Sequence, residues 1–159
     1  MIIMQKVKKF MIVLLFPMIL LGEQHIFKIP DNILGYKRTE VYNKLKKKPD
    51  VSNSLIDTYN AGYIIFYDKN NFVDGVMISV RKKKNHLSLK GITLGDDIQK
   101  VRELYGKELR LNSSHMGSDE AIWKMDDKWL IVGLSKDKKS SIISVTYCKQ
   151  DSFAMISIF

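Results

Sequence analysis

The stretch GITLGDDIQKVRELYG, from Gly91 to Gly106, decides how the rest of the chain is interpreted. Asp96 is a good helix N-cap residue, and Gln99, three positions later, completes a capping box. Asp97 in the first turn suits the helix dipole. Apolar residues then follow at helical spacing until Gly106 ends the run, namely Ile98, Val101, Leu104 and Tyr105. The Gly-Asp-Asp sequence therefore predicts the start of a helix rather than a pair of catalytic carboxylates.

A similar pattern occurs earlier in the chain. Three pairs of segments align in the same order: FKIPDNILGYKRTEV (27–41) with LSLKGITLGDDIQKV (87–101), LIDTYNAGYIIF (55–66) with AIWKMDDKWLIV (121–132), and VMISV (76–80) with ISVTY (143–147). The order, the spacing and the period of the apolar residues agree in all three pairs. We therefore predict two tandem repeats, residues 25–84 and residues 85–148.

Each predicted repeat contains one helix followed by three strands. The first helix covers about residues 37–47 and the second begins at Asp96. The strands are expected at residues 55–59, 63–68, 72–80, 121–125, 129–134 and 141–147, between turn-forming residues. Successive hairpins produce an antiparallel sheet. The predicted fold is therefore α+β, with two tandem helix-plus-three-strand repeats and helices on one face of the sheet.

Residues 1–22 resemble a secretory signal peptide. Lysines precede an apolar run, residues 10–21, which Pro17 interrupts and which is shorter than the ~20 residues of a spanning helix. An uncleaved membrane anchor is the alternative. Glu23 stands where a lipoprotein would carry its lipidated cysteine. We expect an extracytoplasmic protein, periplasmic or secreted, which is membrane-anchored if the leader is not cleaved.

The chain is basic, with 26 basic and 17 acidic residues. Without the three lysines of the leader, 23 basic residues remain, and the net charge is near +6. This charge favours solubility and weak attraction to anionic lipid or polymer. The clusters at Lys44–Pro49 and Arg81–His86 lack interleaved aromatic residues, so a nucleic-acid partner is not expected. Cys148 is the only cysteine, which excludes an internal disulfide and leaves it buried, free or paired with another chain.

The sequence predicts no catalytic, metal or cofactor site. His25, His86 and His115 have no neighbours at zinc-ligand spacing. Ser113–His115 and Asp119–Glu120 bring a hydroxyl, an imidazole and carboxylates into one loop. Because a working triad needs groups from separate elements, a hydrolase built on this loop is not favoured. We therefore expect a protein that is not an enzyme.

Strand alternation divides the predicted sheet into two faces. The aliphatic set is assigned to the helix-covered core: Ile56, Ile64, Phe66, Val76, Ile78, Val80, Ile122, Leu130, Val132, Leu134, Ile143 and Val145. The opposite face is aromatic, sulfur-bearing and polar, which is typical of a binding surface. Its candidate partner-binding residues are Tyr59, Tyr63, Tyr67, Trp123, Met125 and Trp129. Alternatively this face is covered by a dimer mate or by the C-terminal segment, residues 149–159, which could also add a strand.

The stretch GITLGDDIQKVRELYG, its repeat NILGYKRTEVYNKLKKKP, and the hairpin and strand after each resemble the β-lactamase-inhibitor-protein fold. They are also similar to the small outer-membrane-assembly lipoproteins that carry one such unit. The resemblance covers residues 27–147 and implies a concave sheet face that binds a protein, here through Tyr59, Tyr63, Trp123 and Trp129. The chain lacks the paired cysteines of the inhibitors and the lipidated cysteine of the lipoproteins.

The predicted function is that of an exported, non-enzymatic protein-interaction module, either inhibitor-like or an envelope-assembly helper. It would bind a protein partner through the aromatic sheet face. The alternative is a basic module that associates with a membrane surface or an anionic envelope polymer. The residues do not define the partner or the oligomeric state.

Overall fold

The computed structural model describes residues 26–80, 86–113, 118–137 and 140–152. The predictions for the leader, the Arg81–Lys84 cluster, His115 and residues 153–159 fall outside these residues. In the described chain the fold is α+β, as predicted, with a large antiparallel sheet, a small sheet and two α-helices.

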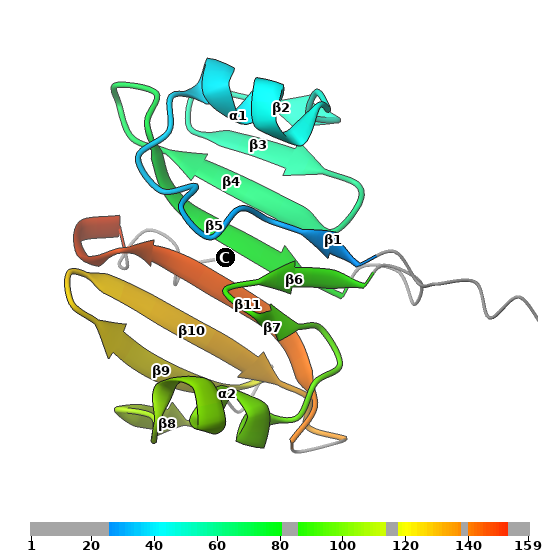
Figure 1. Cartoon of the computed structure of the whole chain (residues 1–159), viewed down its shortest axis with the longest axis vertical. Helices are drawn as coiled ribbons and strands as arrows, with labels where there is room; N and C mark the ends of the chain where they lie inside the picture. The colour runs from blue at the N-terminus through cyan, green and yellow to red at the C-terminus, as the bar shows by residue number, and fades with distance from the viewer. Residues whose placement is uncertain (1–25, 81–85, 114–117, 138–139, 153–159) are drawn as a thin grey trace, which may run out of the picture.

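The large sheet has eight strands in the order β2-β3-β4-β5-β11-β10-β9-β8, and every neighbouring pair is antiparallel (Figure 1). Its strands are β2 (Val51–Ser52), β3 (Ile56–Tyr59), β4 (Tyr63–Tyr67), β5 (Val73–Ser79), β8 (Arg110–Asn112), β9 (Asp119–Met125), β10 (Lys128–Leu134) and β11 (Ile142–Lys149). The six longer strands were predicted. β2 and β8, at the two edges, were not.

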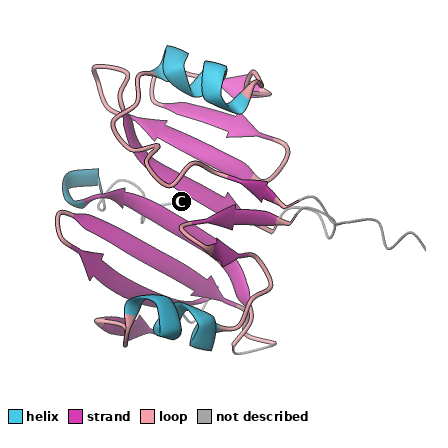
Figure 2. Ribbon diagram, viewed as in Figure 1, coloured by secondary structure: helices cyan, strands magenta, loops and turns pink. Residues whose placement is uncertain are grey.

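Both predicted helices are present, α1 at Arg38–Leu45 and α2 at Ile98–Tyr105. They lie on the same face of the large sheet, one toward each edge (Figure 2). Their buried residues join the sheet in one hydrophobic cluster, namely Val41, Leu45, Ile98 and Val101. Each helix therefore uses its apolar side to cover part of the sheet.

The start of α2 differs from the prediction by one residue. Asp97, not Asp96, is the N-cap, and its carboxylate accepts a hydrogen bond from the Gln99 backbone N–H at 2.8 Å. Asp96 instead accepts from the Thr93 backbone N–H at 2.8 Å and pairs with Lys100 at 2.7 Å. Both carboxylates therefore have structural partners, which confirms that Gly-Asp-Asp builds the turn into the helix.

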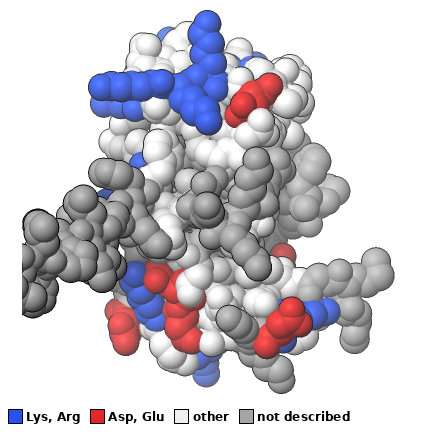
Figure 3. Space-filling model, turned by 90° about the vertical axis from the view of Figure 1, so that its right-hand side faces the viewer, with Lys and Arg blue, Asp and Glu red and all other residues white. Residues whose placement is uncertain are grey.

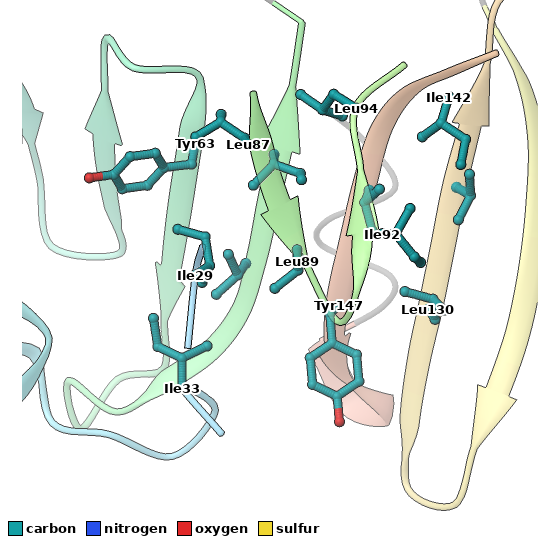
Figure 4. Close-up of a cluster of buried hydrophobic side chains, with 14 of the residues drawn as sticks. Ile29, Ile33, Tyr63, Leu87, Leu89, Ile92, Leu94, Leu130, Ile142 and Tyr147 are labelled. Atoms are coloured by element: carbon teal, nitrogen blue, oxygen red, sulfur yellow. The ribbon is translucent and has the colours of Figure 1, made fainter. Parts of the chain in front are cut away.

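A small three-stranded sheet fills the space between the helices. It consists of β1 (Phe27–Lys28), β6 (Leu87–Leu89) and β7 (Ile92–Thr93), with β1 parallel to β6 and β6 antiparallel to β7. Its apolar side chains lie against β5, β10 and β11 (Figure 4). Leu89 and Ile92 are fully buried, as is Ile29, which directly follows β1. The core therefore lies between the large sheet and a layer made of α1, the small sheet and α2. A short 3-10 helix, η1 (Gln150–Ser152), follows β11.

Candidate functional site

The structure moves most of the predicted binding residues into the core. Tyr59, Tyr63, Tyr67 and Trp123 belong to the helix-covered cluster, and none is more than 3% exposed. Met125 is half-buried and packs against the same cluster. The expected open aromatic face is therefore wrong for these five side chains. Trp129 alone lies on the opposite face, where it packs beside Phe66 and Cys148.

The error has a simple cause in the strand register. In β4 and β5 the structure pairs Tyr63 with Ile78, so the tyrosine side of β4 shares a face with the core side of β5. In β9 and β10 it pairs Trp123 with Leu130, with the same effect. A shift of one residue exchanges the two faces of a strand. A β-bulge between Phe66 and Tyr67 shifts the pairing of β4 with β5 by one residue, so that Tyr67 lies opposite Val73.

Several aliphatic residues change sides as a result. Half of the predicted core set is confirmed in the helix-covered cluster: Val76, Ile78, Leu130, Val132, Leu134 and Val145. Ile56, Ile64 and Phe66 instead lie in the cluster of the opposite face. Ile122 is on that face too, because strand alternation places it opposite to Trp123. The opposite face of the sheet is therefore more aliphatic than predicted.

Tyr59 and Tyr63 form a stacked pair inside the helix-covered core. Their ring centroids are 4.3 Å apart, and the ring of Phe27 stacks on Tyr63 at 5.5 Å. Both hydroxyl groups are buried, and neither has a hydrogen-bond partner among the described residues. Burial raises the pKa of Tyr63 to about 12, with a further contribution from the Asp50 carboxylate. These tyrosines therefore contribute apolar packing, and their hydroxyl groups weaken rather than strengthen the core.

Tyr67 has a polar partner that the other two tyrosines lack. Its hydroxyl donates to the Asp57 carboxylate at 2.9 Å. Asp57 is fully buried and also accepts two hydrogen bonds from the Arg38 guanidinium, one of them from Nε at 3.1 Å. Arg38 begins α1 and Asp57 lies in β3, so this buried ion pair joins the first helix to the sheet.

The buried ion pair predicts a dependence of stability on pH. Burial opposes ionisation of Asp57, but hydrogen bonds from Arg38, Ser52 and Tyr67 outweigh it and lower the pKa of the carboxyl group. A lowered pKa contributes stability that is complete above the unfolded pKa, about 3.9, and is lost as the pH falls through the folded value. We expect urea midpoints measured below pH 4 to fall more steeply in the wild type than in Asp57→Asn. If the urea midpoints of the two proteins decrease equally with pH, the lowered pKa of Asp57 is contradicted.

A different surface, at the β8 edge of the sheet, has the properties of a contact site. Leu109, just before β8, is 66% exposed. It lines a depression of about 240 Å³ together with Arg110, Ile122 and Trp129. Leu109 and Arg110 are exposed and Trp129 is half-buried. Leucine, arginine and tryptophan side chains around a hollow are typical of protein contact sites, where tryptophan and arginine are enriched among the energetically dominant residues. We refer to these four residues as the Leu109 surface.

A second, larger depression of about 530 Å³ adjoins Leu109. Its lining residues are Tyr105, Lys107, Glu108, Leu109, Trp123 and Lys124. It lies where the chain passes from the end of α2 to β8. The Trp123 indole N–H donates to the Gly106 carbonyl oxygen at 2.9 Å, so this lining residue also holds the loop at the end of α2. Sequence alternation alone did not indicate either depression.

The described residues contain no group of histidine, cysteine, aspartate and glutamate side chains that could hold a metal ion. Cys148 is a free thiol with no exposed surface, and burial raises its pKa to about 12, assisted by the Asp74 carboxylate. A thiol in this state is a packing residue rather than a nucleophile. Within the same described ranges, no helix has both the length and the apolar character needed to cross a membrane.

Comparison with known proteins defines a fold rather than a family. No protein-family model matches the chain, and no curated protein sequence matches it. Two solved structures share the fold. One is an extracellular protein containing an SCP domain from Bacillus anthracis, with a TM-score of 0.55, 10% sequence identity and 77% of this chain covered. The other is a cysteine-rich secretory protein from Staphylococcus aureus, with a TM-score of 0.56, 11% identity and 84% covered.

The chain spans about half the length of these two proteins, 46% of the first and 53% of the second. A DUF4309 family protein from Bacillus subtilis also matches, with a TM-score of 0.48, 14% identity, and 71% of this chain and 78% of that one covered. The fold is therefore one that occurs in extracellular bacterial proteins. The resemblance to β-lactamase-inhibitor proteins stays a prediction.

Proposed function

We propose that the chain is an exported, non-enzymatic interaction module that binds a protein partner through the Leu109 surface. The observation that carries the proposal is the exposure of Leu109 between two depressions, one of which contains Trp129. An apolar side chain that projects from a sheet edge beside a hollow can anchor a partner, because both sides then bury apolar area. Trp129 is the one predicted binding residue that lies at this surface.

The comparisons support an exported module. Two structures with the same fold belong to proteins described as extracellular or secretory, and the chain corresponds to about half of each. The leader predicted at residues 1–22 is consistent with the same location. An inhibitor-like role and an assembly-helper role would each fit a module that binds a protein partner.

We also propose that the two halves arose by duplication. α1 is followed by β2 to β5, and α2 is followed by β8 to β11. The last strand of each half, β5 or β11, lies at the centre of the sheet, and the first lies at an edge. Phe27 and Leu87, which align in the two sequence segments, are also paired in the small sheet. These correspondences support one helix-and-sheet unit present twice.

Site-specific photocrosslinking tests the proposed contact surface. A photoreactive amino acid replaces Leu109, and the matched control replaces Val51, which is 63% exposed at the opposite sheet edge. In the native envelope or secreted fraction we expect one saturable protein adduct from position 109 and none from position 51. The same adducts from both positions, or no protein adduct from position 109, would contradict the proposal.

The alternative function, association with an anionic surface, is favoured by one feature. Lysine and arginine side chains gather at the end of the molecule that carries α1 (Figure 3). Lys44, Lys46, Lys47 and Lys48 at the end of this helix are all exposed. A third photoreactive position, at Lys48, separates the two functions. Adducts with anionic lipid or polymer there, without a protein adduct at position 109, would favour the alternative.

A further inference from the structure

The edge of the large sheet is incomplete beside the larger depression. β8 pairs with β9 only from Arg110–Ile122 to Asn112–Glu120, whereas β9 continues to Met125. The last bond across this edge runs from the Leu109 N–H to the Ile122 carbonyl oxygen at 2.8 Å. The final residues of β9 therefore pair with β10 on one side and with no described strand on the other.

The open part of the edge presents main-chain groups. In an antiparallel strand, the N–H and C=O of every second residue point to the same side. Ile122 uses its C=O toward β8, so the N–H and C=O of Lys124 point to the same side, where β8 no longer lies. The described ladder between β8 and β9 ends at Ile122, and outside the ladders neither group has a hydrogen-bond partner in the described chain. An added strand could bond to both of them.

The wall of the depression is held in place before anything binds. Gly106 ends α2 with a φ of 78°, and its N–H donates to the Arg102 carbonyl oxygen at 2.8 Å. Its own carbonyl oxygen accepts from Trp123 at 2.9 Å. Arg102 donates two hydrogen bonds to the Glu108 carboxylate, at 2.9 and 2.7 Å. Because the loop is preformed, little conformational entropy is lost when a ligand enters.

The charge of the depression is positive. Glu108 is its only acidic lining residue, and the hydrogen bonds from Arg102 lower the pKa of its carboxyl group to about 2. The carboxyl group is therefore ionised at neutral pH, where it forms an ion pair with Arg102. Neither lysine of the lining forms a salt bridge within the described chain, although Lys107 also helps to lower the pKa of Glu108. The Lys124 ammonium lies 5.8 Å from the Trp129 ring centroid, on the opposite side of β9 from the Trp123 side chain. Two lysines beside the open strand edge, one on each side of it, favour carboxylates on the ligand.

We propose that this site binds an acidic, extended segment of a protein partner. The segment pairs with the N–H and C=O of Lys124 as an added strand, and its carboxylates lie beside the Lys124 and Lys107 side chains at this edge. The main chain supplies affinity and the two lysines supply the preference for acidic sequences. This inference rests on the proposed function, because it names the kind of segment that the edge next to Leu109 recognises.

A fluorescent synthetic peptide tests the inference directly. The probe is a six-residue peptide of alternating glutamate and valine, and its anisotropy is titrated with the full chain at low and at physiological salt. We expect saturable binding that weakens with salt, since exposed charges are screened. Lys107→Glu and Lys124→Glu should each reduce the affinity by at least about tenfold, corresponding to about 1.4 kcal/mol. Lys44→Glu, the same charge change on exposed α1, should have little effect.

Two altered peptides separate strand pairing from simple charge attraction. The same peptide with N-methylated alternate amides keeps its carboxylates but cannot pair as a strand, so we expect it to lose binding. A lysine and valine peptide should not bind. Equal binding of the methylated peptide, or equal losses from Lys44→Glu and Lys124→Glu, would overturn the inference. A protein adduct at position 109 together with no acidic-peptide binding would overturn this inference alone and leave the proposed function standing.

Discussion

We expect Arg38→Ala to lower the free energy of unfolding by about 3–5 kcal/mol, because it leaves the Asp57 carboxylate buried without its counter-charge. Asp57 has no exposed surface, and Arg38 is its only cationic partner among the described residues. Ser52 and Tyr67 contribute hydrogen bonds but no positive charge. The measurement is chemical denaturation near neutral pH, where the carboxyl group is ionised in the wild type.

An exposed ion pair provides the matched control for Arg38→Ala. The Lys28 ammonium lies 3.2 Å from the Asp31 carboxylate, with side chains 61% and 47% exposed. Pairs of this kind contribute less than about 1 kcal/mol. We therefore expect Lys28→Ala to shift the unfolding midpoint only slightly. An equally small loss of stability in both variants would contradict the conclusion that the buried Arg38–Asp57 pair stabilises the contact of α1 with the sheet.

We expect the three tyrosines of the helix-covered core to respond differently to loss of the hydroxyl group. Tyr63→Phe keeps the stacked ring and removes a buried hydroxyl without a partner, so it should leave stability unchanged or raise it. Tyr59→Phe should behave in the same way. Tyr67→Phe removes a hydrogen bond to a carboxylate and should cost about 1.5–3 kcal/mol.

Loss of the whole ring at position 63 should have a much larger effect. Tyr63 is 1% exposed and packs between Phe27 and Tyr59, so Tyr63→Ala should cost about 3–5 kcal/mol by creating a cavity. Urea unfolding of the four variants gives the comparison. A Tyr63→Ala chain as stable as Tyr63→Phe would show that the ring is exposed, as the sequence had suggested, and that the register described here is wrong.

The helices and the longer strands could be predicted because each has a local signal. The apolar spacing from Ile98 to Tyr105 and the stop at Gly106 define α2 whatever surrounds it. The choice between Asp96 and Asp97 as N-cap could not be made in the same way, because either carboxylate can accept the first backbone N–H. Tertiary contacts decide it, since Asp96 is engaged by Thr93 and Lys100.

The two faces of the sheet could not be assigned from alternation alone. β4 carries Tyr63, Ile65 and Tyr67 on one side and Ile64 and Phe66 on the other, so both sides are apolar enough to be buried. Which side faces the helices depends on the pairing with β5, and this includes a bulge that has no sequence signal. Tyr59, Tyr63, Tyr67 and Trp123 were therefore placed on the wrong side, although the strands themselves were placed correctly.

The Leu109 surface was missed for a related reason. β8 has only three residues, and β2 has two, so neither strand has a recognisable period. The available signal was weak: Leu109 and Leu111 alternate with charged or polar neighbours in KELRLN and are both more than half exposed. Whether such a short segment forms an edge strand depends on the sheet that it joins, and this context cannot be predicted from the local sequence.

The position of β11 has a consequence for the order in which the molecule can fold. It is the last strand of the described residues, yet it lies between β5 and β10 at the middle of the sheet. Until residues 142–149 have been synthesised, neither β5 nor β10 can pair with β11. The strands of the first half and those of the second half therefore cannot form one continuous sheet. Contacts between residues so distant in sequence form slowly. The central ladder of the sheet therefore forms only after residues 142–149 have been synthesised.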